Sequence, residues 1–260
     1  MEAGELSITA SMPGVLHLRD ALGAHMTLLT GTHRALLVDA GYGLCDLQEK
    51  LKTFTALPMM PVCTHAHYDH ALGCLRLPNA YLSETDYPAW QKATGIDQRM
   101  RVLARLRSER IAFSAQQREE YVTLDSKPFQ PLREEWFHLG GMDAQVIPMP
   151  GHTRGSIGIW VPQRQLLLAG DNLNPVVWLF FKDSCLLSDY AEMMRSLLRI
   201  PFAFILCPHA DRLYLREEAE AYVRGLSTIR LGHAQRIQIP PYTDIATVSL
   251  SPAQGFTLVT

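Results

Sequence analysis

The sequence predicts an α+β fold in which two strand-rich halves flank a helical segment. In residues 6–65, and again from about residue 135, short apolar or alternating runs recur between Gly and Pro residues, as is typical of strands joined by turns. The stretch between them lacks alternation, and each half ends in a helical pattern. Strands followed by helices in each half predict sheets that pack on each other with helices outside.

The first half contains five expected strands and one expected helix. Apolar residues recur at helical spacing in residues 44–54, which predicts the helix. A tight turn, Asp39-Ala40-Gly41-Tyr42-Gly43, closes the fourth strand. The expected strands are Leu6–Thr9, Val15–Leu18, His25–Thr30, Ala35–Asp39 and Pro61–Thr64.

Residues 86–121 are rich in arginine and show no β alternation, which predicts one or two helices. We place here a helical insertion, at about residues 86–125, within a single domain that spans residues 1–260. A solvated helix face is the default interpretation of the arginines. A lid that contacts an anionic substrate is the alternative.

The second half repeats the order of strands and then helices. Its expected strands are Trp136–Leu139, Ala144–Pro148, Ser156–Val161, Gln165–Ala169 and Phe202–Cys207. Its expected helices are Tyr190–Leu198 and Leu215–Leu226. The last 25 residues, with Pro240, Pro241 and Pro252, are expected to form an irregular tail or an edge strand.

Composition narrows the class of protein. The chain has 260 residues with 24 basic and 26 acidic side chains, and a net charge of −2 gives no reason to expect nucleic acid as a partner. Neither a secretion signal nor an apolar run long enough to span a membrane is apparent. The five cysteines form no Cys-x-x-Cys pair, which favours reduced thiols and a cytoplasmic protein.

The hexapeptide His65-Ala66-His67-Tyr68-Asp69-His70 is the strongest functional signal in the chain. Three imidazoles so close together would repel one another when protonated, and would leave polar atoms without partners when neutral and buried. A metal ion resolves both problems, because imidazole and carboxylate suit zinc and related ions. In an extended stretch His65 and His67 point to the same side, while Asp69 and His70 fall where the chain can turn toward a second ion.

Three further candidate ligands each follow an expected strand. His152 lies on a Gly-punctuated loop, Asp171 ends an apolar run, and His209 comes after Leu206-Cys207-Pro208. A sheet presents side chains past its strand ends at one rim, so these residues are expected to complete the pattern. Core packing is the default interpretation of the other four cysteines. Cys207, which lies two residues before His209, is a candidate for a further role.

In type and order these motifs resemble those of the metallo-β-lactamase superfamily: a His-x-His-x-Asp-His signature, a Gly-His-Thr loop, a bridging Asp and a final His. Val38-Asp39-Ala40-Gly41 also resembles an early family motif, whose Asp supports the metal loop from behind. The resemblance covers about residues 15–210, with one departure, since Pro208 stands where the family usually has Gly. It implies a four-layer αβ/βα sandwich with a two-metal site at one edge.

The resemblance also implies a ligand set and a chemistry. His65, His67 and His152 would hold one metal, Asp69, His70 and His209 the other, and Asp171 would bridge the two. Two divalent ions are expected, zinc first, with iron or manganese as alternatives because these ligands accept all three. A metal-bridging hydroxide would then attack a carbonyl carbon, with Asp69 orienting it or passing a proton to the leaving group.

We therefore expect a metal-dependent hydrolase that acts on a small-molecule ester or thioester, most like glyoxalase II or a thioesterase. Asp171 favours this branch, because classical metallo-β-lactamases generally lack the bridging carboxylate. The alternatives are a lactonase or β-lactamase-type amide hydrolase, and a metal-binding protein without hydrolytic turnover. Tyr68, Trp178 and Phe180 are candidates for a substrate pocket, with core packing as the other interpretation. The sequence gives no oligomeric state.

Overall fold

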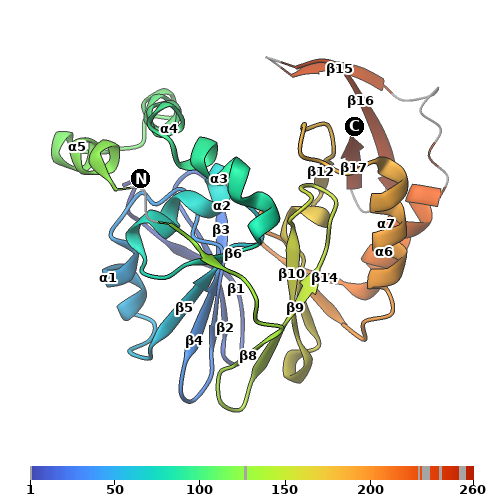
Figure 1. The fold of residues 1–260 in the computed structure, drawn as a ribbon, viewed down its shortest axis with the longest axis horizontal. Coiled ribbons are helices and arrows are strands. Elements are labelled where there is room, and N and C mark those ends of the chain that lie inside the picture. Colours follow the sequence, from blue (N-terminus) through green and yellow to red (C-terminus); the bar gives the residue numbers. More distant parts are fainter. Residues whose placement is uncertain (1, 126–127, 228, 230–234, 240–241, 252–255) are drawn as a thin grey trace. The chain divides into compact units, whose positions relative to one another are not determined.

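The computed structural model describes residues 2–125, 128–227, 229, 235–239, 242–251 and 256–260 (Figure 1). The chain divides into two compact units, Met1–Gln145 and Val146–Thr260. Strands of mixed sheets and several helices occur in both units, which confirms the predicted α+β class. The prediction of one domain over residues 1–260 stays a prediction.

A seven-stranded sheet in the order β1-β2-β3-β4-β5-β6-β7 forms the scaffold of the first unit. β1 to β4 are antiparallel neighbours, and β5, β6 and β7 continue the sheet in parallel. The strands are β1 (Ser7–Met12), β2 (Val15–Arg19), β3 (His25–Thr30), β4 (Ala35–Val38), β5 (Met59–Val62), β6 (Tyr81–Leu82) and β7 (Gln130–Pro131). The five predicted strands are confirmed, whereas two-residue strands such as β6 and β7 are too short to leave a periodic pattern.

Helices cover the central strands of this sheet. All four residues of β4 are buried, which agrees with its continuous apolar run. α1 (Leu47–Lys52) begins at Asp46, whose side chain accepts a hydrogen bond from the Glu49 N–H, and it buries Leu47 and Leu51. α2 (Tyr68–Ala71) and the 3₁₀ helix η1 (Leu72–Arg76) follow β5. The helix predicted for residues 44–54 is confirmed but shorter.

The turn after β4 and the segment from α2 to η1 approach each other backbone to backbone. The Ala40 N–H donates to the His70 carbonyl (2.8 Å), and the Gly73 N–H donates to the Gly41 carbonyl (3.0 Å). A Cβ atom on Gly73 would lie 1.9 Å from the Ala40 carbonyl oxygen. Only glycine fits at residue 73, so this contact fixes the position of α2 against the end of β4.

Gly73→Ala is therefore expected to lower the free energy of unfolding by about 3 kcal/mol, because backbone must move to admit the methyl group. Gly141→Ala is the matched control, since nothing lies within 4 Å of a Cβ at residue 141. Its positive φ of 70° leaves only a conformational cost of about 1 kcal/mol. Denaturant unfolding of both variants checks the difference, and equal losses would contradict the packing argument.

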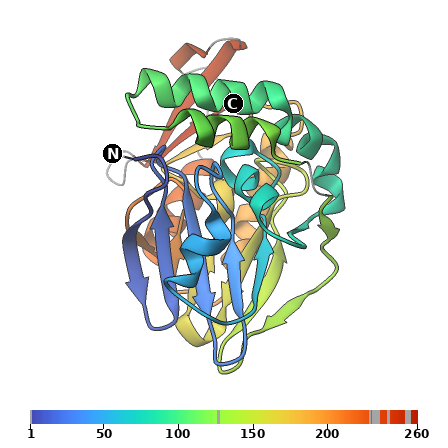
Figure 2. The same cartoon turned by 90° about the vertical axis from the view of Figure 1, so that its left-hand side faces the viewer.

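Three helices occupy the insertion, one more than the largest number predicted (Figure 2). A 3₁₀ turn, η2 (Glu84–Asp86), leads into α3 (Tyr87–Thr94), α4 (Ile96–Ser108) and α5 (Ala115–Thr123). Gly95 separates α3 from α4. Ser114 and Gln117 form a capping box at the start of α5. These local signals explain why the arginine-rich stretch is divided in this way.

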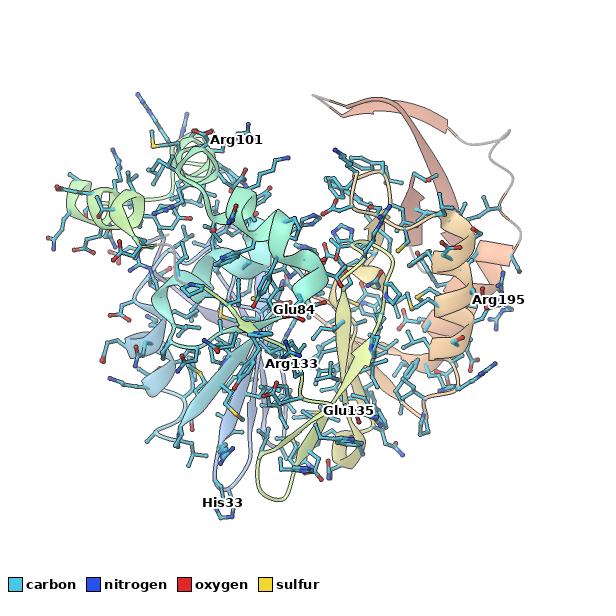
Figure 3. The ribbon with its side chains drawn as sticks, viewed as in Figure 1. His33, Glu84, Arg101, Arg133, Glu135 and Arg195 are labelled. Atoms are coloured by element: carbon cyan, nitrogen blue, oxygen red, sulfur yellow. The ribbon has the colours of Figure 1, made fainter. Side chains whose placement is uncertain are left out.

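The arginines of the insertion do not share one role. Arg99 is buried, and its guanidinium donates to four main-chain carbonyls, those of Thr94, Tyr121, Val122 and Leu124 (2.7–3.2 Å). Arg99 thus fastens α4 to the end of α5. Arg101 is exposed to solvent (Figure 3), as the default interpretation expects.

The second sheet has the order β14-β13-β11-β10-β9-β8, and the chain passes from the first unit into the second within β9. β11 pairs antiparallel with β10 and parallel with β13, while β8 and β9 form a hairpin. The strands are β8 (Trp136–His138), β9 (Asp143–Pro148), β10 (Ile157–Val161), β11 (Leu166–Leu168), β13 (Phe204–Leu206) and β14 (Leu213–Leu215). The five predicted strands of this half are confirmed to within two residues at each end, and β14 adds a sixth.

Among the described residues of the second unit, two α-helices pack against its core, as predicted. α6 (Leu187–Leu197) and α7 (Arg216–Ser227) place Tyr190 and Tyr222 in the core, where the two hydroxyls lie 2.6 Å apart. Short 3₁₀ turns, η3 (Pro162–Arg164) and η4 (Gly170–Asn172), follow β10 and β11. No helix in the described part of the chain is long and apolar enough to cross a membrane.

The irregular tail or single edge strand predicted for the last 25 residues is wrong. They supply three strands of a four-stranded sheet in the order β12-β17-β16-β15, made of β12 (Val176–Trp178), β15 (Gln235–Ile239), β16 (Tyr242–Ser251) and β17 (Phe256–Val259). β12 and β17 pair in parallel although they are far apart in the chain. A local pattern cannot reveal such a partner. Pro240, Pro241 and Pro252 lie outside the described residues.

Candidate metal centre

The four polar side chains of the hexapeptide lie together in the first unit, just past the end of β5. The ring of His65 lies 4.7 Å from that of His67 and 4.1 Å from that of His70, between centroids. Ligand-capable atoms lie within 4.8 Å of each other for His65 with His67, for His65 with His70, and for Asp69 with His70. His65 and His70 are fully buried, whereas His67 and Asp69 are half-buried.

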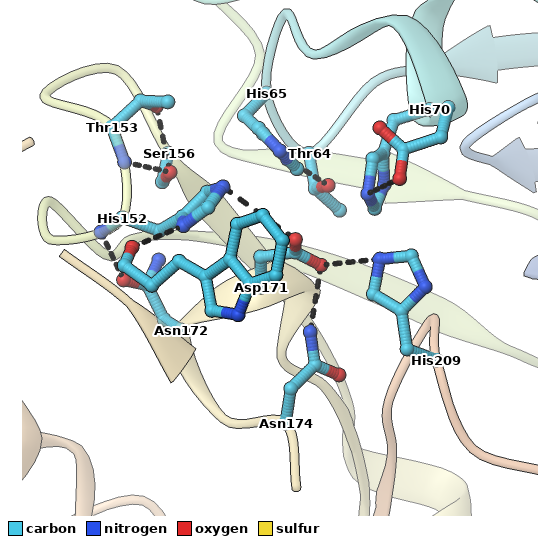
Figure 4. A network of polar contacts seen from close by, with 12 residues as sticks. Thr64, His65, His70, His152, Thr153, Ser156, Asp171, Asn172, Asn174 and His209 are labelled. Atoms are coloured by element: carbon cyan, nitrogen blue, oxygen red, sulfur yellow. Dashed lines mark hydrogen bonds and ion pairs between the residues drawn. The ribbon is translucent and has the colours of Figure 1, made fainter. Parts of the chain in front are cut away.

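Asp39 holds this cluster from behind. It has a positive φ of 61°, which an Asp tolerates better than most residues. Its carboxylate accepts hydrogen bonds from the Thr64 N–H (2.7 Å), the Thr64 hydroxyl and the Nδ1 atom of His70 (2.9 Å). The Thr64 oxygen also lies 3.1 Å from Nδ1 of His65 (Figure 4). With both Nδ1 atoms engaged, Nε2 is the nitrogen of each ring that can bind a metal.

The second cluster lies in the second unit and has Asp171 at its centre. One carboxylate oxygen is 3.5 Å from Nε2 of His152, and the other is 3.4 Å from Nε2 of His209 (Figure 4). The Asn174 amide donates to Asp171 (2.8 Å). Nδ1 of His152 lies 2.6 Å from the Trp178 carbonyl oxygen, so its Nε2 atom too is the one that can bind a metal.

Sheet topology explains why these three residues meet. β11 and β13 are parallel neighbours, so Asp171 and His209, which follow them, lie at the same sheet edge. β10 runs antiparallel to β11, which brings its amino end, and with it the preceding His152 loop, to that edge. The Asn172 side chain accepts the His152 N–H (2.8 Å) and fixes the loop.

Cys207, which the sequence leaves as a candidate for a role beyond core packing, has a structural role. It is fully buried, its sulfur donates to the Leu173 carbonyl, and burial raises the pKa of its thiol well above the ordinary value. A protonated, buried thiol is a poor metal ligand and nucleophile. The neighbouring Pro208 does not prevent His209 from reaching Asp171.

The three candidate pocket residues differ. Burial and the neighbouring Asp69 raise the pKa of Tyr68, whose hydroxyl bonds to Tyr42. Tyr42 in turn accepts a hydrogen bond from Arg105 of α4 (2.6 Å), so Tyr68 is tied to the insertion. Trp178 and Phe180 lie in the second unit with ring centroids 5.4 Å apart, and Trp178 is 37% exposed.

Sequence reasoning misses three supporting residues: Thr64, Asn172 and Asn174. Each is adjacent to, or within three positions of, a candidate ligand. Proximity in sequence is the only signal that points to them. It does not reveal which carboxylate or N–H each side chain meets, because the contacts join Thr64 to Asp39 and Asn172 to His152 across long stretches of chain.

Both clusters have the chemistry of transition-metal ligands. Each combines imidazole nitrogens with a carboxylate, and His70 and His152 use Nδ1 for a protein oxygen in the manner of metal-bound histidines. The donor sets therefore fit the divalent ions that the sequence predicts.

Comparisons with known proteins agree with this chemistry. The family model of the metallo-beta-lactamase superfamily matches residues 19–209. The acyl-coenzyme A thioesterase MBLAC2 of Gallus gallus is 26% identical over 192 residues, which are 68% of this chain and 67% of that protein.

Solved structures share the fold at lower identity. A metallo-beta-lactamase from Pontibacter korlensis is 16% identical with a TM-score of 0.58, covering 86% of this chain and 100% of that one. The protein TTHA1623, solved in a di-iron-bound form, is 23% identical with a TM-score of 0.53, covering 74% of this chain and 89% of that one. The predicted metallo-β-lactamase-like fold class is confirmed. Since the family model spans well over half of its length, the chain belongs to the metallo-beta-lactamase superfamily and is a hydrolase.

Proposed function

We propose that the chain is a dinuclear metal-dependent hydrolase that cleaves acyl thioesters. One ion would be held by His65, His67 and His152, the other by Asp69, His70 and His209, and both by Asp171. The observation that carries this proposal is the donor set of the two clusters, in which His70 and His152 are oriented through Nδ1 by the Asp39 carboxylate and the Trp178 carbonyl. Zinc is the first candidate, and iron or manganese would accept the same ligands.

Bound divalent ions would lower the pKa of water from about 16 toward 7 and polarise the substrate carbonyl. The side chains of this chain determine where that chemistry occurs. Asp39 and the Trp178 carbonyl hold the imidazoles of His70 and His152 in fixed orientations, so little reorganisation is needed during turnover. Asp69 is half-buried beside His70 and serves as the group that accepts the proton of the nucleophile.

The leaving group favours a thioester over an amide. A thiol has a pKa of about 8.5, so a thiolate departs without a strong acid to protonate it. An amide nitrogen must be protonated as it leaves, which asks more of a carboxylate such as Asp69. The named relative of Gallus gallus is an acyl-coenzyme A thioesterase, which supports the same substrate class.

Two other functions are compatible with the family. Several structural neighbours are metallo-beta-lactamases, but at 13–16% identity they bear on the fold alone. A lactonase or a β-lactamase-type amide hydrolase is therefore the second candidate. A metal-binding protein without turnover is the third, and the superfamily and the thioesterase relative count against it.

A substrate panel separates these functions. Wild-type protein loaded with zinc, iron or manganese is assayed on an acyl-coenzyme A, on S-lactoylglutathione, on an aliphatic lactone and on a cephalosporin. We expect turnover of a thioester, and a loss of about 100-fold or more in kcat for Asp69→Asn, because the substitution removes a proposed metal ligand together with the proton acceptor. Asp189→Asn, at an exposed position on α6, is the control. Faster turnover of the lactone or the cephalosporin would instead support the second candidate.

A further inference from the structure

Three aromatic side chains gather beside the second cluster: Trp178, Phe180 and Phe181, here called the aromatic shelf. Ring centroids lie 5.4 Å apart for Trp178 and Phe180, 5.9 Å for Trp178 and Phe181, and 4.6 Å for Phe180 and Phe181. The neighbouring rings are inclined by only 32–39°, so their faces present one broad apolar surface. Phe180 and Phe181 are half-buried, and Trp178 is 37% exposed.

The aromatic shelf extends along β12. Val176 and Trp178 are two residues apart on this strand and so point to the same face, while Val177 between them is fully buried on the other. Val176 is 46% exposed. An exposed apolar surface built from two aromatic residue types and a valine is costly in water, which indicates a surface that binds something apolar.

The aromatic shelf is joined to a candidate metal ligand at two points. The Trp178 carbonyl oxygen lies 2.6 Å from Nδ1 of His152. The Phe181 ring stands edge-on to the His152 ring, at 5.4 Å between centroids and 89° between planes. A group bound at His152 is thus adjacent to the shelf, and an apolar extension of that group would lie along the rings.

We propose that the aromatic shelf binds the acyl chain of the substrate and makes the enzyme select acyl thioesters with longer alkyl chains over acetyl. This inference rests on the proposed function, since the acyl carbonyl must be the group held beside His152. The alkyl chain, and not the carrier, fits the shelf because the three rings offer flat hydrocarbon faces with no charged atom among them. Each methylene laid on such a surface contributes about half of the roughly 0.8 kcal/mol of full burial, or about twofold in affinity.

The chain itself offers a clean variant and a matched control. Trp178→Ala removes the ring but keeps the main-chain carbonyl that His152 meets, so the support of the candidate ligand is retained. Trp136→Ala removes a ring of equal exposure, 38% against 37%, from β8 in the first unit. Differences between the two variants therefore report on the location of the ring and not on the loss of a surface tryptophan.

The test measures kcat/KM of the metal-loaded full chain for acetyl-, butyryl-, hexanoyl- and decanoyl-coenzyme A. In wild type and Trp136→Ala we expect kcat/KM to rise about twofold per methylene, and thus on the order of 50-fold from butyryl to decanoyl. In Trp178→Ala the rise from butyryl to decanoyl should fall below about tenfold. An unchanged rise, or an equal loss at every chain length, would overturn the proposal.

A binding measurement keeps this outcome separate from that of the proposed function. Decanoate and hexanoate are titrated calorimetrically into wild type and both variants, with no turnover required. We expect decanoate to bind at least about tenfold more weakly to Trp178→Ala than to wild type or Trp136→Ala. If decanoate binds in this way while no thioester is hydrolysed, the proposed function fails and the apolar site stands. If decanoate binds Trp178→Ala as tightly as wild type, the shelf is not an acyl site. The same conclusion follows if light scattering shows wild type to be a dimer that Trp178→Ala dissociates.

Discussion

Asp171→Asn should reduce kcat/KM by about 1000-fold and lower the metal content of the purified protein. Asp171 lies within 3.5 Å of both His152 and His209, and it is largely buried. The amide keeps the shape and removes the charge, so the proposed centre would lose an anionic ligand that offsets the charge of its cations. Elemental analysis and steady-state kinetics on the thioester that wild type hydrolyses fastest provide the measurement.

Asp143→Asn is the control for this prediction. Asp143 also pairs with an imidazole, His138 at 2.7 Å, but that pair is exposed at the β8–β9 hairpin. We expect Asp143→Asn to keep full metal content and activity, since an exposed ion pair of this kind contributes little to stability. An Asp171→Asn protein with two bound ions and wild-type turnover would remove the bridging role from the proposed mechanism.

Asp39→Ala should destabilise the protein by about 3–5 kcal/mol and weaken metal binding 10- to 100-fold. Three buried donors, the N–H and hydroxyl of Thr64 and Nδ1 of His70, would lose their acceptor. His70 would also lose the carboxylate that orients its ring. Denaturant unfolding in chelator isolates the structural loss, and metal titration of the folded protein isolates the effect on the ligand.

Asp46→Ala offers the comparison. Asp46 accepts one exposed backbone N–H at the start of α1, and its loss should cost about 1 kcal/mol with no change in metal affinity. The loss of stability in Asp39→Ala should therefore be severalfold larger than in Asp46→Ala. Asp39→Ala alone should also weaken metal binding. If both variants bind metal as tightly as wild type, Asp39 stabilises the fold but does not support His70 as a metal ligand.

The candidate ligands could be predicted from sequence because they follow strands whose apolar runs are plain. His65 comes after Val62 and Asp171 after Leu168, and strand ends are where a sheet presents side chains. The supporting contacts could not be predicted in the same way. That Thr64 meets Asp39 depends on β4 and β5 being parallel neighbours, a tertiary fact with no local pattern.

Secondary structure shows the same division. The helix predicted at residues 190–198 exists because apolar positions at helical spacing bury Tyr190, Met194 and Leu197. The terminal sheet escapes prediction, since β12 has only three residues and pairs with a strand at the other end of the unit. α2 escapes too, being a single turn, although the sequence does indicate a turn at Asp69 and His70.

The placement of every candidate ligand beyond a strand end bears on how such a protein can diversify. Register between paired strands places the strand ends from which the candidate ligands follow, so a joining segment that bears no candidate ligand can change length or composition without displacing them. The insertion of residues 86–125 and the loop that bears the aromatic rings contain none of those ligands. Descendants of one ancestral hydrolase could therefore acquire new substrates by altering these two segments alone, with the reaction chemistry inherited intact.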